Sequence, residues 1–173
     1  MTETERMYAY FICSIPMIGG ERAGQLLSRF GDPQGVYEAG TAGWREILSD
    51  SVVEYMDRQK KSGNLEEEYH SLGEKQIGLV LQEEEGFPRK LLEIPDPPYG
   101  LFYKGKLPEQ KQPSVAVIGA RECSEYGRFV AEELGRYLGS QEIQVISGMA
   151  RGIDGISQQA ALLAGGTSYG VLG

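Results

Sequence analysis

The sequence predicts an α/β protein in which a small all-helical domain precedes a Rossmann-like parallel sheet. Three observations lead to this prediction. Residues 1–62 carry apolar residues at helical spacing, residues 63–112 mix short apolar strands with prolines, and residues 113–173 alternate apolar strands with amphipathic helices. With right-handed crossovers, the last pattern gives three parallel strands, which form the first half of a doubly wound sheet.

The helical domain is divided by residues that start and stop helices. Pro16 ends the first helix because it restricts the residue before it. Gly31 suits the position after a helix, and Asp32 followed by Pro33 is typical of a helix start. The expected helices are residues 4–14, residues 21–30, two short helices around Val36 and Trp44, and residues 51–61.

The middle segment, residues 63–112, is expected to connect the two domains. Asn64 is placed to cap a helix that continues to residue 75. The prolines between residues 95 and 98 force an extended turn. The other expected elements are strands at residues 77–81 and 101–103 and a brief helix at residues 87–92. The polar stretch 104–113, which ends in a proline, is the best candidate for a linker.

The last domain is expected to bury its first strand, residues 114–118, on both faces, because the strand is continuously apolar. The other expected elements are strands at residues 143–146 and 168–172 and helices at residues 125–139 and 154–164. The first of these helices is expected to point five large apolar residues inward: Phe129, Val130, Leu134, Tyr137 and Leu138. A three-stranded parallel sheet needs cover on both faces and an occupied edge. Further strands are therefore expected in a complete protein, of which this chain would be an N-terminal fragment.

The composition limits the chemistry that the chain can perform. A net charge of −8 argues against a general polyanion binder, so any nucleic-acid site must be local. Cys13 and Cys123 are far apart in the sequence and are expected to be reduced thiols in the cytosol. His70 is the only histidine, so neither a zinc site nor a histidine-dependent catalytic triad is expected.

The apolar run at residues 7–18 is interpreted as a buried first helix. Acidic residues precede it instead of a basic segment, and it is shorter than the ~20 residues that cross a bilayer. A soluble cytoplasmic protein without a membrane partner is expected.

The first glycine-rich loop follows the first strand, at the place of a dinucleotide-binding fingerprint. That fingerprint has glycine at its first, third and sixth positions, whereas this loop has Gly119, Arg121 and Ser124 there. A large third side chain prevents the backbone from approaching a pyrophosphate, so NAD binding is disfavoured. Arg121 is instead expected to bind a phosphate, while Ser124 caps the next helix. The alternative is that Arg121 pairs with a nearby carboxylate.

The second loop follows the second strand and has the small residues Ser147, Gly148 and Gly152, which permit close backbone approach. Because the carboxyl ends of parallel strands share one edge of a sheet, this loop is expected beside the first one. Arg151 and Arg121 would then flank one or two phosphates, although a solvent-facing Arg151 without a ligand is an equally good interpretation of that residue alone. Asp154 is interpreted as a helix cap rather than a catalytic base.

These loops resemble those of the DNA-processing protein A (DprA/Smf) family, and the resemblance spans nearly the whole chain. The residues that carry it in the last domain are Gly119, Arg121, Ser124, Tyr126, Gly127, residues 147–154, Ala161, Leu162 and residues 165–167. Upstream, residues 87–105 resemble the segment before that family's Rossmann domain. Ile18, Gly19, Leu26, Leu27, Phe30 and Gly31 resemble its N-terminal domain of the SAM or helix-hairpin-helix type.

The resemblance implies a cytosolic bacterial protein that binds single-stranded DNA, forms homodimers through its Rossmann domain and loads the recombinase RecA during natural transformation. It implies no cofactor and no catalytic activity. The family's phosphate-contacting residues correspond to Arg121 in the first loop and to Ser147, Gly148 and Gly152 in the second, with Arg151 at a position that is commonly basic. One departure is Gln158, which stands where the family usually has histidine.

Other hypotheses remain open at this point. A glycine-containing turn between the first two helices could present N–H groups to DNA phosphates, but a packing or partner-binding role is favoured for it. The chain could be a nucleotide-phosphate hydrolase of the lysine-decarboxylase-like Rossmann group, although it lacks that group's later glycine-rich segment. It could also be an inactive truncated product.

Overall fold

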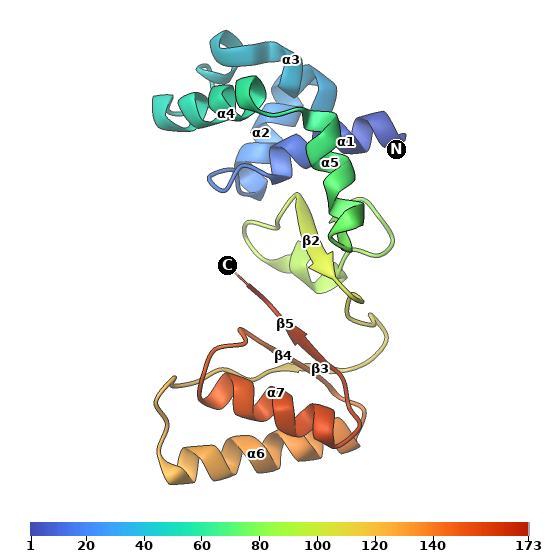
Figure 1. Cartoon of the computed structure of the whole chain (residues 1–173), viewed down its shortest axis with the longest axis vertical. Coiled ribbons are helices and arrows are strands. Elements are labelled where there is room, and N and C mark those ends of the chain that lie inside the picture. The colour runs from blue at the N-terminus through green and yellow to red at the C-terminus, as the bar shows by residue number, and fades with distance from the viewer. Residues whose placement is uncertain (173) are drawn as a thin grey trace. The chain divides into compact units, whose positions relative to one another are not determined.

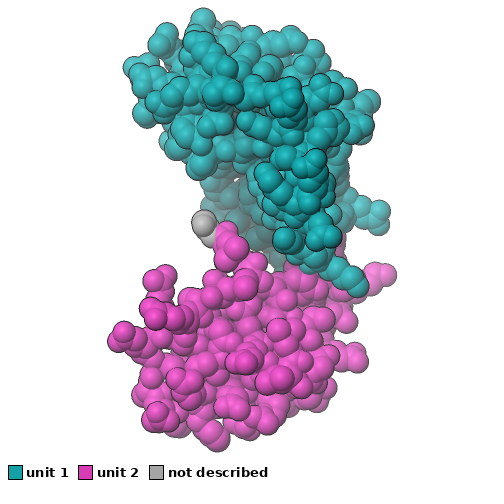
Figure 2. All heavy atoms as spheres, viewed as in Figure 1, with its two compact units in different colours: residues 1–106 teal, residues 107–173 magenta. Residues whose placement is uncertain are grey.

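The computed structural model describes residues 1–172 and contains two compact units, Met1–Lys106 and Leu107–Gly173 (Figures 1 and 2). The first unit contains helices and a two-stranded sheet, and the second contains a three-stranded parallel sheet with two helices. The predicted fold class is therefore confirmed. Each unit is described by itself below.

Five helices make up most of the first unit: α1 (Glu3–Cys13), α2 (Gly20–Phe30), α3 (Pro33–Trp44), α4 (Asp50–Ser62) and α5 (Leu65–Glu74). Their starts follow local chemistry. Thr2 and Glu5 form a reciprocal capping box at α1, and the Asp32 side chain accepts a hydrogen bond from Gly35 N at 2.7 Å at the start of α3. Gly40, with φ of 62°, interrupts α3, so the two short helices expected there form one element with a kink.

The core of the first unit is centred on Trp44, which is fully buried and donates its indole N–H to Val36 O at 2.7 Å. The antiparallel hairpin of β1 (Ile77–Leu81) and β2 (Gly100–Lys104) contributes Leu79 and Leu81 to the same core. Arg6 of α1 pairs with Glu84 and donates to Leu79 O at 2.6 Å. Hairpin and helices are therefore joined by both apolar packing and an ion pair.

In the first unit, one local expectation is wrong and another is refined. Asn64 occupies the N-cap position of α5, but its side chain makes no capping hydrogen bond. The brief helix expected at residues 87–92 is a 3₁₀ helix, η1 (Arg89–Glu93). Pro88 precedes η1 in an extended conformation, and the proline-containing residues 95–98 follow it, so the helix is short.

The second unit follows the expected βαβαβ order with β3 (Ser114–Ala116), α6 (Glu125–Ser140), β4 (Gln144–Ser147), α7 (Ile153–Leu163) and β5 (Ser168–Gly170). The strands are parallel in the order β3-β4-β5, and Val145 of the central strand pairs with Val115 on one side and Ser168 on the other. Figure 1 shows α6 and α7 on the same side of this sheet. Because the three strands are parallel, their carboxyl ends all lie at one edge of the sheet.

Helix α6 packs on α7 through its small residues, which corrects the sequence-based expectation for this helix. Ala131, Gly135 and Gly139 are buried, and a Cβ atom on Gly135 would lie 2.3 Å from the Ser157 carbonyl oxygen. Of the five large residues expected to point inward, only Leu138 is buried; Phe129, Val130, Leu134 and Tyr137 are exposed. The close approach of α7 leaves space for hydrogen atoms but not for large side chains.

The expectation that residues 114–118 are buried on both faces is also wrong for the described residues. Val117 is buried against α6 and α7 with Val145, but Val115 is 37% exposed and Ile118 is 76% exposed. The segment before β3 is nevertheless held on the sheet. The buried Gln144 amide donates to Glu109 O at 2.8 Å and to Gln112 O at 3.2 Å, and it accepts from Glu109 N.

Candidate nucleic-acid interface

The loops after β3 and β4 contact each other at the carboxyl edge of the sheet. Ile153 N donates to Ala120 O at 3.2 Å, which joins the start of α7 to the first loop. Gly152 has a φ of 85°, and a Cβ atom there would lie 2.2 Å from Ala120 O. Only glycine combines this backbone conformation with such a close approach. The two loops that the sequence assigned to one edge are thus side by side.

Asp154 is a buried bridge between the two loops. Its side chain is 6% exposed, and its two carboxylate oxygens accept hydrogen bonds from Gly119 N at 3.0 Å and Gly148 N at 3.1 Å. The residue at the N-cap position of α7 is Gly152, so the interpretation of Asp154 as the cap of its own helix is wrong. The N–H groups of Gly119 and Gly148 already have an anionic partner within the chain.

The hydrogen bonds to Asp154 determine its ionisation. Burial acts to raise the pKa of this carboxyl group, but the hydrogen bonds that it accepts, including those from Gly119 and Gly148, outweigh burial and lower the pKa below its ordinary value of 3.8. The ionised form is therefore the stable partner of both loops.

Acid is expected to break this bridge only below the usual carboxyl range. Because the pKa is lowered in the folded chain, the stabilisation is complete above about pH 4 and is lost as the pH falls through the folded-state pKa, below 3.8. Amide NMR signals of Gly119 and Gly148, followed from pH 6 to pH 2, report this step. A common midpoint clearly above 3.8 would contradict it.

Two serines predicted for the site have different positions in it. Ser124 Oγ accepts from Gly127 N at 3.1 Å and caps α6, as expected. Ser147 is buried, and its hydroxyl donates to Val117 O, so it joins β4 to β3 and does not face solvent. Of these two hydroxyls, only that of Ser124 lies on the exposed side of the loops.

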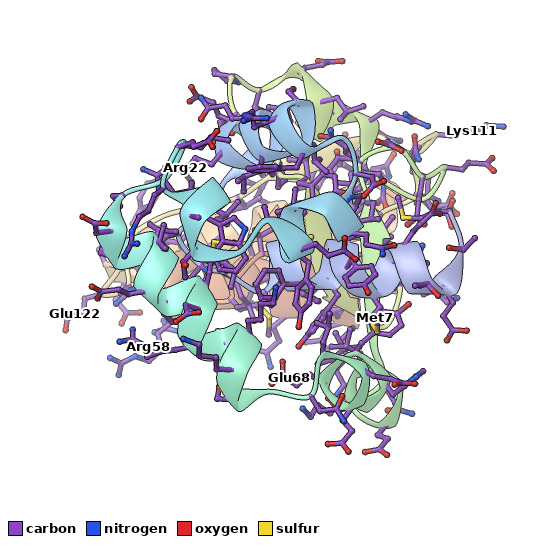
Figure 3. All side chains as sticks on the ribbon, turned by 90° about the horizontal axis from the view of Figure 1, so that it is seen from above. Met7, Arg22, Arg58, Glu68, Lys111 and Glu122 are labelled. Carbon is purple, nitrogen blue, oxygen red and sulfur yellow. The ribbon has the colours of Figure 1, made fainter. Side chains whose placement is uncertain are left out.

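Arg121 and Arg151 are the exposed cations of the two loops. Both side chains are solvent-accessible, and among residues 1–172 neither forms a hydrogen bond or an ion pair. The alternative in which Arg121 pairs with a neighbouring carboxylate is therefore not what the described residues show. Glu122, which points away from the ribbon in Figure 3, is also exposed. The loops thus offer two available guanidinium groups beside the capped start of α6.

The unusual backbone conformation of Met149 could not be predicted from the sequence. This residue has a φ of 56°, in the left-handed region that non-glycine residues seldom adopt, and it is 63% exposed. Its side chain lies over Gly170 of β5, where an added Cβ atom would be 2.1 Å from Met149 Sδ. The one sequence feature that hints at a tight turn is the position of Met149 between two small residues, Gly148 and Ala150.

Gln158 has a structural role at the position where the resemblance led us to expect histidine. It is 8% exposed, and its amide donates to Ser168 Oγ at 3.0 Å and to Tyr169 O at 3.2 Å. Ser168 in turn donates to Val145 O at 3.1 Å. The residue therefore fastens α7 to β5 without carrying charge.

The glycine-containing turn in the first unit is closed by a carboxylate. Asp96 Oδ1 accepts from Glu21 N at 2.6 Å at the start of α2, and a Cβ atom on Gly20 would lie 1.7 Å from Pro97 O. The two arginines close to this turn are also engaged, since Arg22 (labelled in Figure 3) donates to Met17 O and Arg29 pairs with Glu46. These contacts favour a packing role for the turn.

Other site chemistries find little support in the part of the chain that the structure describes. Among residues 1–172 there is no group of three side chains suited to hold a metal ion, and no helix there is long and apolar enough to cross a membrane. Cys13 and Cys123 are free, and burial raises the pKa of the Cys13 thiol to about 12. Cys13 is thus a packing residue rather than a nucleophile.

Comparison with known proteins shows the family of this chain. A family model described as DNA recombination-mediator protein A matches residues 78–173. The DNA processing protein DprA of Streptococcus pneumoniae is 44% identical over 87 residues, which are 50% of this chain and 30% of that protein. Protein Smf of Escherichia coli is 37% identical over 95 residues, which are 55% of this chain and 25% of that protein.

A solved structure extends the similarity to both units. The X-ray structure of DNA processing protein A (DprA) from Streptococcus pneumoniae matches with a TM-score of 0.70 and 27% identity, over 96% of this chain and 57% of that one. This chain therefore spans less than two thirds of the proteins that it matches. The family model covers more than half of the chain, and its match includes both loops. The chain belongs to the DNA recombination-mediator protein A family, also known as DprA/Smf.

Proposed function

We propose that this chain contributes the single-stranded DNA binding of a recombination mediator. Arg121 and Arg151, on the exposed outer rim of the loops after β3 and β4, would hold the DNA phosphates. The observation that carries this proposal is the pair of exposed arginines, without ion-pair partners among the described residues, on adjoining loops at the carboxyl edge of the sheet. A guanidinium group binds a phosphodiester through two parallel hydrogen bonds. The family to which the chain belongs supports DNA as the source of those phosphates.

Single-stranded DNA suits this site better than duplex DNA. The net charge of −8 opposes a long run of phosphate contacts along a rigid duplex. A flexible strand can bring one or two phosphates to the local cations and place a base against an aromatic ring. Tyr126, in the first turn of α6 directly after the first loop, is 77% exposed and offers such a ring.

The wider role is proposed from the family alone. We infer that a protein with the full length of these relatives acts in the cytoplasm without a cofactor or a catalytic step, forms a homodimer, and passes single-stranded DNA to a recombinase of the RecA type during natural transformation. The names of the relatives in Streptococcus pneumoniae and Bacillus subtilis, both DNA processing protein DprA, support DNA processing as the general activity.

Binding of a labelled oligo-dT, measured by fluorescence anisotropy, tests this function. We expect saturable binding that weakens with salt, with a slope near −0.7 in log K against log salt for each phosphate engaged. A duplex of equal length should compete poorly. Absence of binding at low salt would overturn the proposal, and release of free base from nucleoside monophosphates would favour the hydrolase alternative.

A further inference from the structure

Asp154 occupies the position at which a nucleotide-binding Rossmann fold would hold a phosphate. In such folds, the N–H groups of the glycine-rich turns point at the phosphate beside the start of a helix. Here the N–H groups of Gly119 and Gly148 both donate to the Asp154 carboxylate, at 3.0 and 3.1 Å. The side chain is 6% exposed, so a fixed negative charge lies inside the crevice.

The backbone is closely packed around the Asp154 carboxylate. A Cβ atom on Gly119 would lie 2.7 Å from the Ile153 side chain, and one on Gly148 would lie 3.1 Å from Asp154 Oδ2. Gly152 also lies against the first loop, since an added Cβ atom would be 2.2 Å from Ala120 O. An incoming phosphate would be repelled by the negative charge of Asp154. It would also find that the N–H groups of Gly119 and Gly148 already donate to this carboxylate.

We propose that Asp154 is a positioning and specificity-determining residue. It holds the two loops at a fixed spacing so that Arg121 and Arg151 share one rim, and it keeps free nucleotide phosphates out of the crevice. The role of Asp154 in placing the two arginines on one rim rests on the proposed binding of single-stranded DNA, whereas its exclusion of small phosphates does not. A phosphodiester can then be bound only at the outer edge of the loops.

A matched pair of variants in the full chain separates positioning from charge. Asp154→Asn and Glu122→Gln each remove one negative charge close to the arginines, but Glu122 is exposed and bridges no loops. If charge alone mattered, both variants would bind oligo-dT more tightly. We expect Glu122→Gln to bind up to a few-fold more tightly and Asp154→Asn to bind about tenfold more weakly. Tighter binding by Asp154→Asn would overturn the positioning role.

Hydrogen exchange measures the bridge itself. In Asp154→Asn, the amides of Gly119 and Gly148 should exchange faster, while that of Val145 in the middle of the sheet should keep its rate. Equal acceleration at Val145 would mean that the substitution loosens the whole unit, and this outcome would contradict a specific positioning role. The same measurement shows whether the variant is folded.

The wild-type chain provides a test that does not depend on any variant. Inorganic pyrophosphate, added at millimolar concentration, should leave the amide signals of Gly119 and Gly148 unchanged. Saturable shifts of these signals would overturn the exclusion of small phosphates. If the wild-type chain does not bind oligo-dT, the proposed function fails, and the hydrogen-exchange and pyrophosphate results then decide the role of Asp154.

Discussion

Replacement of Gly135 by alanine is expected to destabilise the second unit by about 1–3 kcal/mol, the usual range for overpacking a tight core. The new Cβ atom would lie 2.3 Å from the Ser157 carbonyl oxygen and 2.9 Å from Ser157 Cα, and both are backbone atoms that cannot rotate away. Helix α6 must then move off α7. Because this unit is small, such a loss is a large share of the stability that its core can supply.

Gly127, on the same helix, is the matched control. A Cβ atom there would lie 3.4 Å from Cys123 Cβ, which is ordinary van der Waals contact. Gly127→Ala should therefore gain helix propensity, up to about 1 kcal/mol, without a clash. The two substitutions are chemically identical and are expected to have opposite signs.

Denaturant unfolding distinguishes the two variants. Trp44 is the only tryptophan and lies in the first unit, so its fluorescence follows that unit, while far-UV circular dichroism follows both. The second unit gives a dichroism transition that fluorescence does not follow. Gly135→Ala should lower the midpoint of this transition, and Gly127→Ala should raise it slightly. If Gly135→Ala unfolds at the wild-type midpoint, the close packing of α6 on α7 is wrong.

The order of elements could be predicted from the sequence because local residues mark their ends. Gly31, Asp32 and Pro33 separate α2 from α3, and Ser124 starts α6. These are contacts between residues close in the chain, so the sequence alone identifies them. The adjacency of the two loops was also predictable, because it follows from parallel pairing of β3 with β4.

The buried face of α6 could not be predicted in this way. Its apolar residues form a broad arc, and hydrophobicity alone favours the large side chains for burial. The structure instead buries the small ones, Ala131, Gly135 and Gly139, because α7 approaches too closely for the others. This choice depends on the distance between two helices, which is a property of the fold rather than of either segment.

The role of Asp154 was missed for a similar reason. Its position at the start of α7 is typical of a helix cap, and a cap explains an aspartate there without any distant partner. One of its partners, Gly119, is 35 residues away in the sequence and meets it only because both loops lie at one sheet edge. Arg121 and Arg151 are exposed in the structure, and their role as phosphate contacts stays a prediction.

Arg121→Ala is expected to weaken oligo-dT binding by about 1.5–3 kcal/mol, the range for hydrogen bonds to charged groups, which is roughly 10- to 150-fold in affinity. Few other cations are present in the loops to compensate, since Arg151 is the only other basic residue of residues 117–124 and 147–152. Arg121→Lys should recover part of the affinity, because lysine keeps the charge but loses the two parallel hydrogen bonds.

The salt dependence of binding by the Arg121→Ala, Arg151→Ala double variant is the most direct test of the proposed interface. The control is Arg58→Ala, an exposed arginine that projects from α4 in the first unit (Figure 3). If the two loops hold the phosphates, the double variant loses about 0.7 from the salt slope for each contact removed and most of its affinity, and Arg58→Ala changes neither. A double variant with the wild-type slope and affinity would place the DNA elsewhere on the chain and contradict the proposed interface.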